Sequence, residues 1–288
     1  MRIVCGMTTF SREKAPTLLA QSVNSVLAAG FDQLHLFAWD DVTLGKGVYQ
    51  DGVQVHRTRE RLWPFQNFLF GLRTMLAVAP DADGYMIFQD DVVVAKNLRS
   101  WLDQSLWPDG RDDGLVSLYT PAILTDQLGG HHSGWFQMPM PAKDARQRKN
   151  EPHTVGTYGA QAILMSGKFA RAFLKPRPDL RNMNKTDHWL ARFCYENDLP
   201  YWHHDPSLVR HAGAKTPSFY DMPMDQWESH YARYRDCDEF AEDAATVPFP
   251  VSSESVTQTA SATTPPTLSK PMTPAERRAA RLAARQAS

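Results

Sequence analysis

The sequence predicts an α/β fold with a mostly parallel central sheet flanked by helices. Short β-prone apolar runs alternate with segments of helical periodicity, a pattern typical of parallel strands joined by right-handed crossovers. The chain has 288 residues, of which 42% are hydrophobic and 22% are charged. This is the composition of a globular protein, and the length suffices for one large domain or two small ones.

Four apolar runs supply the expected strands of the first half. They cover residues 3–9, 34–39, 53–56 and 85–94, and each is rich in β-branched or aromatic residues and bounded by turn formers. Because helices separate most of these strands, we expect them to pair in parallel and to bring their carboxyl ends to one side of the sheet.

Two helices are expected between these strands. The first begins at Pro16 and ends at Gly30, and the second begins at Pro64 and ends before Pro80, since proline starts and glycine or proline stops a helix. Each presents one apolar face to the sheet, made of Leu19, Val23, Val26 and Leu27 in the first and of Phe65, Phe68, Leu69, Leu72 and Leu76 in the second.

The run 85–94 is interrupted by two adjacent carboxylates, Asp90 and Asp91, which are therefore expected at the carboxyl end of a strand. Burying two neighbouring negative charges is unfavourable unless a cation or hydrogen-bond donors neutralise them. Ligands of parallel α/β sheets bind outside the carboxyl ends of the strands. We therefore expect a ligand site at these aspartates, with an ordinary strand-end turn as the alternative.

The second half is less regular. A long polar and Gly-rich loop is expected at 120–153, and loops of this length are usually functional or mobile. The remaining expected elements are a strand at 115–119, a buried strand ending at Met165, a helix at 168–174, a helix starting at Thr186, and a closing segment at 201–213.

The folded domain is expected to cover residues 1–247. Residues 248–274 are rich in Ser, Thr and Pro, which indicates a disordered linker, and residues 275–288 predict a basic helical tail. From residue 248 onward five basic residues face two glutamates, a net charge of +3. The tail is either a solvated extension or a docking segment for an anionic partner such as nucleic acid.

The composition also indicates where in the cell the protein is expected. No stretch reaches the roughly 18 consecutive apolar residues of a membrane span, and the first nine residues lack the apolar core of a signal peptide. The three cysteines, Cys5, Cys194 and Cys237, have no Cys-x-x-Cys spacing, which argues against a disulfide framework. We expect a cytoplasmic protein without a membrane span.

Several short motifs follow one another in a fixed order between residues 2 and 220. They are Thr8-Thr9 after the first strand, Gln89-Asp90-Asp91, Gly159-x-Gln161-Ala162, Asp187, and Pro-Ser-Leu-Val-x-His-x-Gly with His211. Their order and spacing resemble the glycosyltransferases of the GT-A fold, of the family 2-like, Asp-x-Asp type. A glutamine replaces the first acid of the aspartate motif.

The resemblance implies a hexosyltransferase-like enzyme that moves a sugar from a nucleotide-diphosphate donor to a hydroxyl acceptor such as a glycan. It implies that Asp91 and His211 hold Mn²⁺ or Mg²⁺, which stabilises the departing diphosphate. An imidazole beside a carboxylate suits Mn²⁺ better than Mg²⁺. A hydrogen-bonded loop histidine is the other interpretation of His211.

Further residues are implied to contact the donor or the acceptor, with the polarity of turns as the competing explanation. Trp135 is either a sugar-stacking ring or a core tryptophan. The implied nucleotide-sugar residues are Thr8, Thr9, Arg12, Asp40, Asp41, Asp90 and Gln161, with Gly159 and Lys215 on the acceptor or phosphate side.

Asp187 resembles the catalytic base that takes the proton of the acceptor hydroxyl in an inverting transferase. An aspartate in a first helical turn is also favoured by the helix dipole without any catalytic role. In a retaining enzyme Asp187 loses this assignment.

Two other functions stay open. Gln89 fits a non-catalytic nucleotide-sugar or glycan-binding module of the same fold, and the basic tail fits a transferase that acts on nucleic acid. A zinc site at His131-His132 or His203-His204 is disfavoured, because adjacent histidines do not converge easily on one ion.

Overall fold

The structure, a computed structural model, describes residues 1–10, 17–104, 106–138, 159–175, 186–212, 236–237 and 239–247. The chain divides into a compact unit, Met1–Ser252, and a second unit, Ser253–Ser288. All described residues belong to the first unit, so the predicted linker and basic tail lie outside them. Within the described residues, no helix combines the length and the apolar character that crossing a membrane requires.

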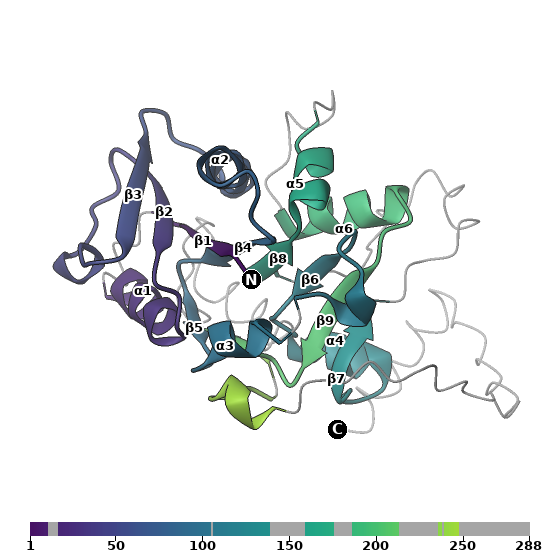
Figure 1. The fold of residues 1–288 in the computed structure, drawn as a ribbon. Helices are drawn as coiled ribbons and strands as arrows, with labels where there is room; N and C mark the ends of the chain where they lie inside the picture. The colour runs from purple at the N-terminus through teal and green to yellow at the C-terminus, as the bar shows by residue number, and fades with distance from the viewer. Residues whose placement is uncertain are drawn as a thin grey trace, which may run out of the picture. The chain divides into compact units, whose positions relative to one another are not determined.

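An eight-stranded sheet with the order β3-β2-β1-β4-β8-β6-β9-β7 forms the centre of this unit (Figure 1). β1–β2, β1–β4, β2–β3 and β6–β9 pair in parallel, and only β8 and β7 run against their neighbours. The predicted α/β class with a mostly parallel central sheet flanked by helices is confirmed. The strands are β1 (Ile3–Thr8), β2 (Leu34–Trp39), β3 (Val53–Thr58), β4 (Gly84–Gln89), β6 (Leu115–Ser117), β7 (Gly134–Gln137), β8 (Ala162–Met165) and β9 (Tyr201–Asp205).

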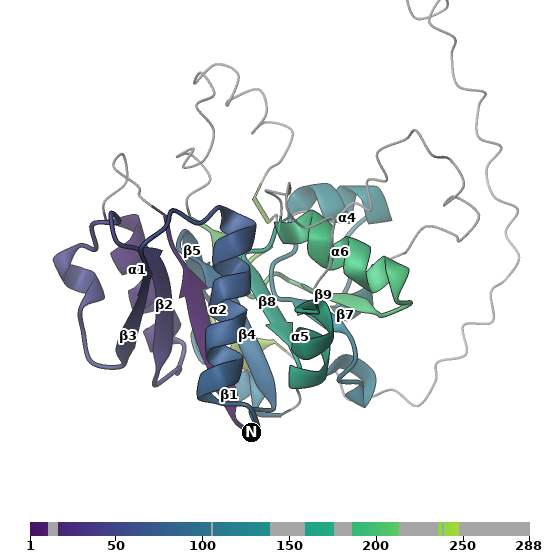
Figure 2. The same cartoon turned by 90° about the horizontal axis from the view of Figure 1, so that it is seen from above.

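Helices cover both faces of the sheet (Figures 1 and 2). The apolar faces predicted for the first two helices lie in two separate core clusters, one on each face. One face carries α1 (Leu18–Ala28) and α3 (Leu98–Leu102), and the other carries α2 (Pro64–Val78), α5 (Gly167–Phe173) and α6 (Thr186–Glu196). The predicted stop at Gly30 has a φ of 96°, which glycine adopts without strain.

The run 85–94 forms two strands. β4 ends at Gln89, so Asp90 and Asp91 directly follow the carboxyl end of a strand, as the sequence predicted. The chain turns at Asp90-Asp91, and β5 (Val92–Val94) pairs with β10 (Val209–His211) in a second, two-stranded sheet. Ser22 of α1 fixes this turn, because its Oγ donates to the Asp90 carbonyl at 3.0 Å and accepts from the Val92 amide at 3.0 Å.

The prediction of a continuous loop at 120–153 was wrong for the first half of that range. α4 (Ala122–Leu128) and β7 lie within it, and β7 pairs antiparallel with β9. Residues 139–153 lie outside the described part of the chain. β8 runs antiparallel to β4 and β6.

The described residues of the segment 236–247, which are 236–237 and 239–247, extend the domain beyond the expected closing segment. They form bridges to Lys96 and Ser207 and include a short 3₁₀ turn at Ala244–Thr246. Trp101 of α3 donates its Nε1 hydrogen to the Val247 carbonyl at 3.2 Å. This segment is therefore part of the core of the unit.

Six strands of the large sheet run in the same direction, so their carboxyl ends lie on one side, here called the carboxyl end of the sheet. β8 begins there because it runs in the opposite direction, and the Gln89 amide donates to the Gln161 carbonyl at 3.0 Å. This geometry gathers residues from β1, β2, β4, β8 and β9 that are far apart in the sequence.

Two histidines face each other on β2 and β3. His35 Nδ1 lies 2.9 Å from His56 Nε2, and the His56 ring stacks on Phe37 with 5.2 Å between centroids. Burial and the nearby His56 charge lower the pKa of His35, and burial lowers the pKa of His56. One neutral ring donates and the other accepts, an arrangement that protonation of both rings abolishes.

We expect the pair to make stability depend on pH. In the unfolded chain both histidines take up a proton near pH 6.5, whereas in the folded state their lowered pKa keeps them neutral to lower pH. The free energy of unfolding therefore falls as the pH drops below about 6.5. Each extra proton contributes at most about 1.4 kcal/mol per pH unit, less for the half-exposed His56. Urea unfolding at pH 7.5 and 5.5 should show a smaller pH effect in His56→Gln than in the wild type. His188→Gln is the control, because His188 is exposed, and it should show the same pH effect as the wild type. If His56→Gln also shows the wild-type pH effect, this expectation is contradicted.

Candidate active site

Asp91 and His211, the two predicted metal ligands, lie together at the carboxyl end of the sheet. Asp91 Oδ2 is 2.9 Å from His211 Nε2, although the residues are 120 positions apart. Both side chains are largely buried, with exposed fractions of 7% and 17%. Two ligand atoms at right angles and about 2.1 Å from one ion are about 3 Å apart. The separation fits a shared divalent ion as well as a direct hydrogen bond.

The second sheet brings these residues together. His211 pairs with Val92, the residue directly after Asp91, in the β10–β5 register. The His211 amide donates to Asp236 Oδ1 at 3.1 Å, and the same oxygen accepts from the Cys237 amide at 2.8 Å. Asp236 thus holds the backbone of His211 in place.

Asp90 is used differently from its neighbour. It is 1% exposed, and its Oδ2 accepts from Thr9 Oγ1 at 2.7 Å and from the Phe10 amide at 3.0 Å. Thr8 and Thr9 are themselves buried at the end of β1. These contacts tie the start of the loop after β1 to the end of β4. Whether Asp90, Thr8 and Thr9 also contact a nucleotide stays a prediction.

Two polar residues that sequence reasoning missed support this arrangement. Asn67 of α2 is buried and donates from Nδ2 to the Thr9 and Phe37 carbonyls at 3.2 and 3.1 Å. Ser22 of α1 is fully buried and holds the Asp90-Asp91 turn. A polar residue on the apolar face of a predicted helix was the available signal for both.

Asp40 and Asp41 are exposed at the end of β2. Beside them, the Trp39 ring lies 4.7 Å from the Arg61 guanidinium and 6.5 Å from Phe10 in an edge-to-face contact. The buried Nε1 of Trp39 has no hydrogen-bond partner among the described residues. The predicted acids thus border an aromatic and cationic surface that the sequence alone did not indicate.

Asp187 lies in the first turn of α6, as predicted. Its carboxylate accepts from the Gly159 amide at 3.1 Å and from the His188 amide at 2.9 Å. Gly159 precedes Gln161, whose backbone bonds Gln89, so Asp187 lies toward the carboxyl end of the sheet. The buried Oε1 of Gln161 has no partner within the described ranges, and such an acceptor is usually satisfied by a ligand or water.

The remaining predicted residues do not join the group around Asp91 and His211. Trp135 packs on Trp101 at 5.7 Å and on His204 at 4.8 Å, which favours its interpretation as a core residue. Arg12 and Lys215 lie outside the described residues.

The histidine pairs do not converge on one ion. His203 and His204 donate through Nδ1 to the carbonyls of Tyr119 and Pro206, and burial lowers the pKa of both to about 4. His132 stacks on Phe136 at 4.6 Å.

The fold and this site define a mixed α/β protein with carboxylates and an imidazole gathered at the carboxyl ends of its strands. No protein-family model matches the chain, and no curated protein matches it. Among solved structures, the chain is similar to a crystal structure of GalNAc-T7 with UDP, GalNAc and Mn2+, with 13% sequence identity and a TM-score of 0.49. The match covers 80% of this chain and 47% of the other, so the chain spans about half the length of that protein.

Proposed function

We propose that this chain is a glycosyltransferase that moves a sugar from a nucleotide-diphosphate donor to a hydroxyl acceptor. The observation that carries the proposal is the 2.9 Å approach of Asp91 Oδ2 to His211 Nε2 at the end of β4. The sequence motifs selected these two residues as ligands of one ion, and they meet although they lie 120 positions apart.

Asp91 and His211 are the residues that would hold Mn²⁺ or Mg²⁺. The bound ion would supply positive charge to the diphosphate leaving group. Ser22 and the β5–β10 pairing fix the backbone on both sides of Asp91, so its carboxylate is positioned before a ligand arrives. Preorganised ligands lose little conformational entropy on binding.

The nucleotide would lie across the ends of β1, β2 and β4. The Asp90 contacts with Thr9 and Phe10 set the start of the loop after β1. Asp40 and Asp41 are exposed beside Trp39 and offer acceptors to a ribose or a base. Gln161 would accept a hydrogen bond from a sugar hydroxyl through its unpaired Oε1.

Asp187 would act as the base of an inverting reaction. The acceptor oxygen bonds the anomeric carbon, the bond from that carbon to the diphosphate breaks, and the acceptor proton moves to the Asp187 carboxylate. The Gly159 amide holds this carboxylate in one orientation. A fixed orientation matters because misplacement of a base lowers the rate steeply.

A donor screen tests the proposal. The full chain is incubated with UDP- and GDP-sugars in Mn²⁺, in Mg²⁺ or in EDTA, and released nucleoside diphosphate is measured. We expect metal-dependent release from at least one donor and none in EDTA. No turnover and no metal-dependent nucleotide binding by calorimetry would refute it. Nucleotide binding without turnover would favour the binding module instead.

The nucleic-acid acceptor receives no support. The predicted basic tail, on which that alternative depends, lies outside the described residues. A cytoplasmic location stays a prediction.

A further inference from the structure

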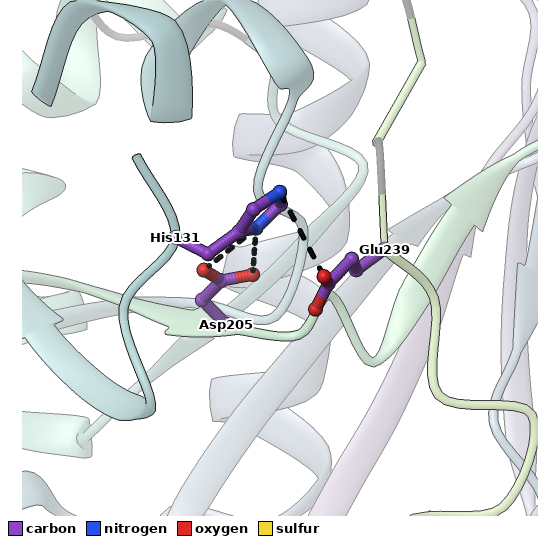
Figure 3. Close-up of side chains that lie close together, drawn as sticks. All are labelled: His131, Asp205 and Glu239. Atoms are coloured by element: carbon purple, nitrogen blue, oxygen red, sulfur yellow. Dashed lines mark hydrogen bonds and ion pairs between the residues drawn. The ribbon is translucent and has the colours of Figure 1, made fainter. Parts of the chain in front are cut away.

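A second group of side chains of the types that ligate metals lies at the end of β9, also at the carboxyl end of the sheet. His131 comes from the loop between α4 and β7, Asp205 from the last position of β9, and Glu239 from the segment 236–247. Figure 3 shows the His131 ring between the two carboxylates. Three segments distant in sequence therefore meet at these side chains.

The distances within this group are short. His131 Nδ1 lies 3.1 Å from Asp205 Oδ2, and His131 Nε2 lies 3.8 Å from Glu239 Oε1. One ligand atom from each residue lies within 4.8 Å of the others. Two ligands about 2.05 Å from a tetrahedral zinc ion are roughly 3.3 Å apart, so the histidine and Asp205 already have nearly that spacing. Glu239, whose side chain is 57% exposed, has room to move closer.

Asp205 is an independent indication that a cation belongs here. Its side chain is 2% exposed, and it accepts from the His132 amide at 2.6 Å and faces the His131 ring. None of the ion pairs found among the described residues joins it to a lysine or an arginine. A buried carboxylate is unfavourable without a positive partner.

We propose that His131, Asp205 and Glu239 bind a divalent transition-metal ion, with Zn²⁺ as the best fit. One imidazole nitrogen and two carboxylate oxygens form a ligand set of the kind zinc takes, and their two negative charges balance the ion. Water completes the coordination on the exposed side. The ion cross-links the loop before β7, the end of β9 and the segment 236–247, and so stabilises the fold at this end of the sheet.

This site is separate from Asp91 and His211. β9 lies three strands from β4 in the order of the sheet, a lateral distance of roughly 14 Å for strands about 4.8 Å apart. The inference does not depend on transferase activity, and its test measures metal binding and stability alone.

Zinc titration of the full chain tests the inference, after dialysis against EDTA and in an Asp91→Asn background that weakens the other candidate site. Calorimetry should give one bound Zn²⁺, and thermal unfolding should move upward by several degrees when zinc is added. His131→Gln and Glu239→Gln change exposed side chains and should each weaken zinc binding by about 10-fold or more.

Glu242→Gln is the matched control, because Glu242 is exposed on the same segment. It should leave zinc affinity and the zinc-dependent shift unchanged. Absence of zinc binding would overturn the inference. Equal zinc affinity in the two test variants and in the control would also overturn it.

Discussion

Asp91→Asn is expected to lower metal-dependent release of nucleoside diphosphate by at least about 100-fold, beyond the 10–100-fold typical of losing a group that only supports a metal ligand. Asparagine keeps the shape of the side chain but removes its negative charge, so it binds a divalent ion poorly. Steady-state rates on the donor found in the screen, together with Mn²⁺ affinity by calorimetry, measure the effect.

Asp51→Asn is the matched control for this variant. Asp51 is exposed in the turn before β3, at the other end of the sheet from Asp91. It should retain wild-type rate and Mn²⁺ affinity, and both variants should unfold within a few degrees of the wild type. If Asp91→Asn keeps full activity and Mn²⁺ affinity, the assignment of Asp91 as a metal ligand is wrong.

Trp101→Ala is expected to have the largest effect on stability, a loss of about 3–5 kcal/mol in the free energy of unfolding. The indole is 2% exposed and packs edge-to-face on His204 at 5.0 Å. Its removal leaves a cavity and frees the Val247 carbonyl from the Nε1 hydrogen bond. Urea unfolding followed by circular dichroism measures the change.

Trp63→Ala provides the comparison, since Trp63 is 43% exposed at the start of α2. Its loss should remain below about 1 kcal/mol, the scale of an exposed cation–π contact with Arg61. Equal losses in the two variants would show that α3 does not anchor the end of the domain. Trp101→Phe retains most of the buried ring, and should fall between the two.

Local signals predicted the first half of the fold well. The helices after Pro16 and from Pro64 have apolar faces whose periodicity alone defines them, and Gly30 ends the first as expected. Their strands pair in parallel because crossover helices impose that direction. The second half was less predictable, since β6, β7 and β8 have three or four residues each. Such short runs carry little periodicity.

The site residues also divide into those that the sequence predicted and those that only the structure revealed. The sequence order selected Asp91, His211 and Asp187 because motif order is visible without a structure. It did not indicate Ser22 or Asn67, whose buried hydroxyl and amide bond backbone groups far away in the chain. It also gave no reason to connect His131 with Asp205 or Glu239, because these lie in three separate segments.

The sequence by itself identified three candidate site residues: the adjacent Asp90 and Asp91 after an apolar strand, and His211 near the end of the domain. The tertiary structure decided that these aspartates differ. Asp90 bonds the chain after β1, whereas Asp91 faces His211. The physical reason is the turn between β4 and β5, which points neighbouring side chains in different directions and pairs β5 with a strand more than a hundred residues away.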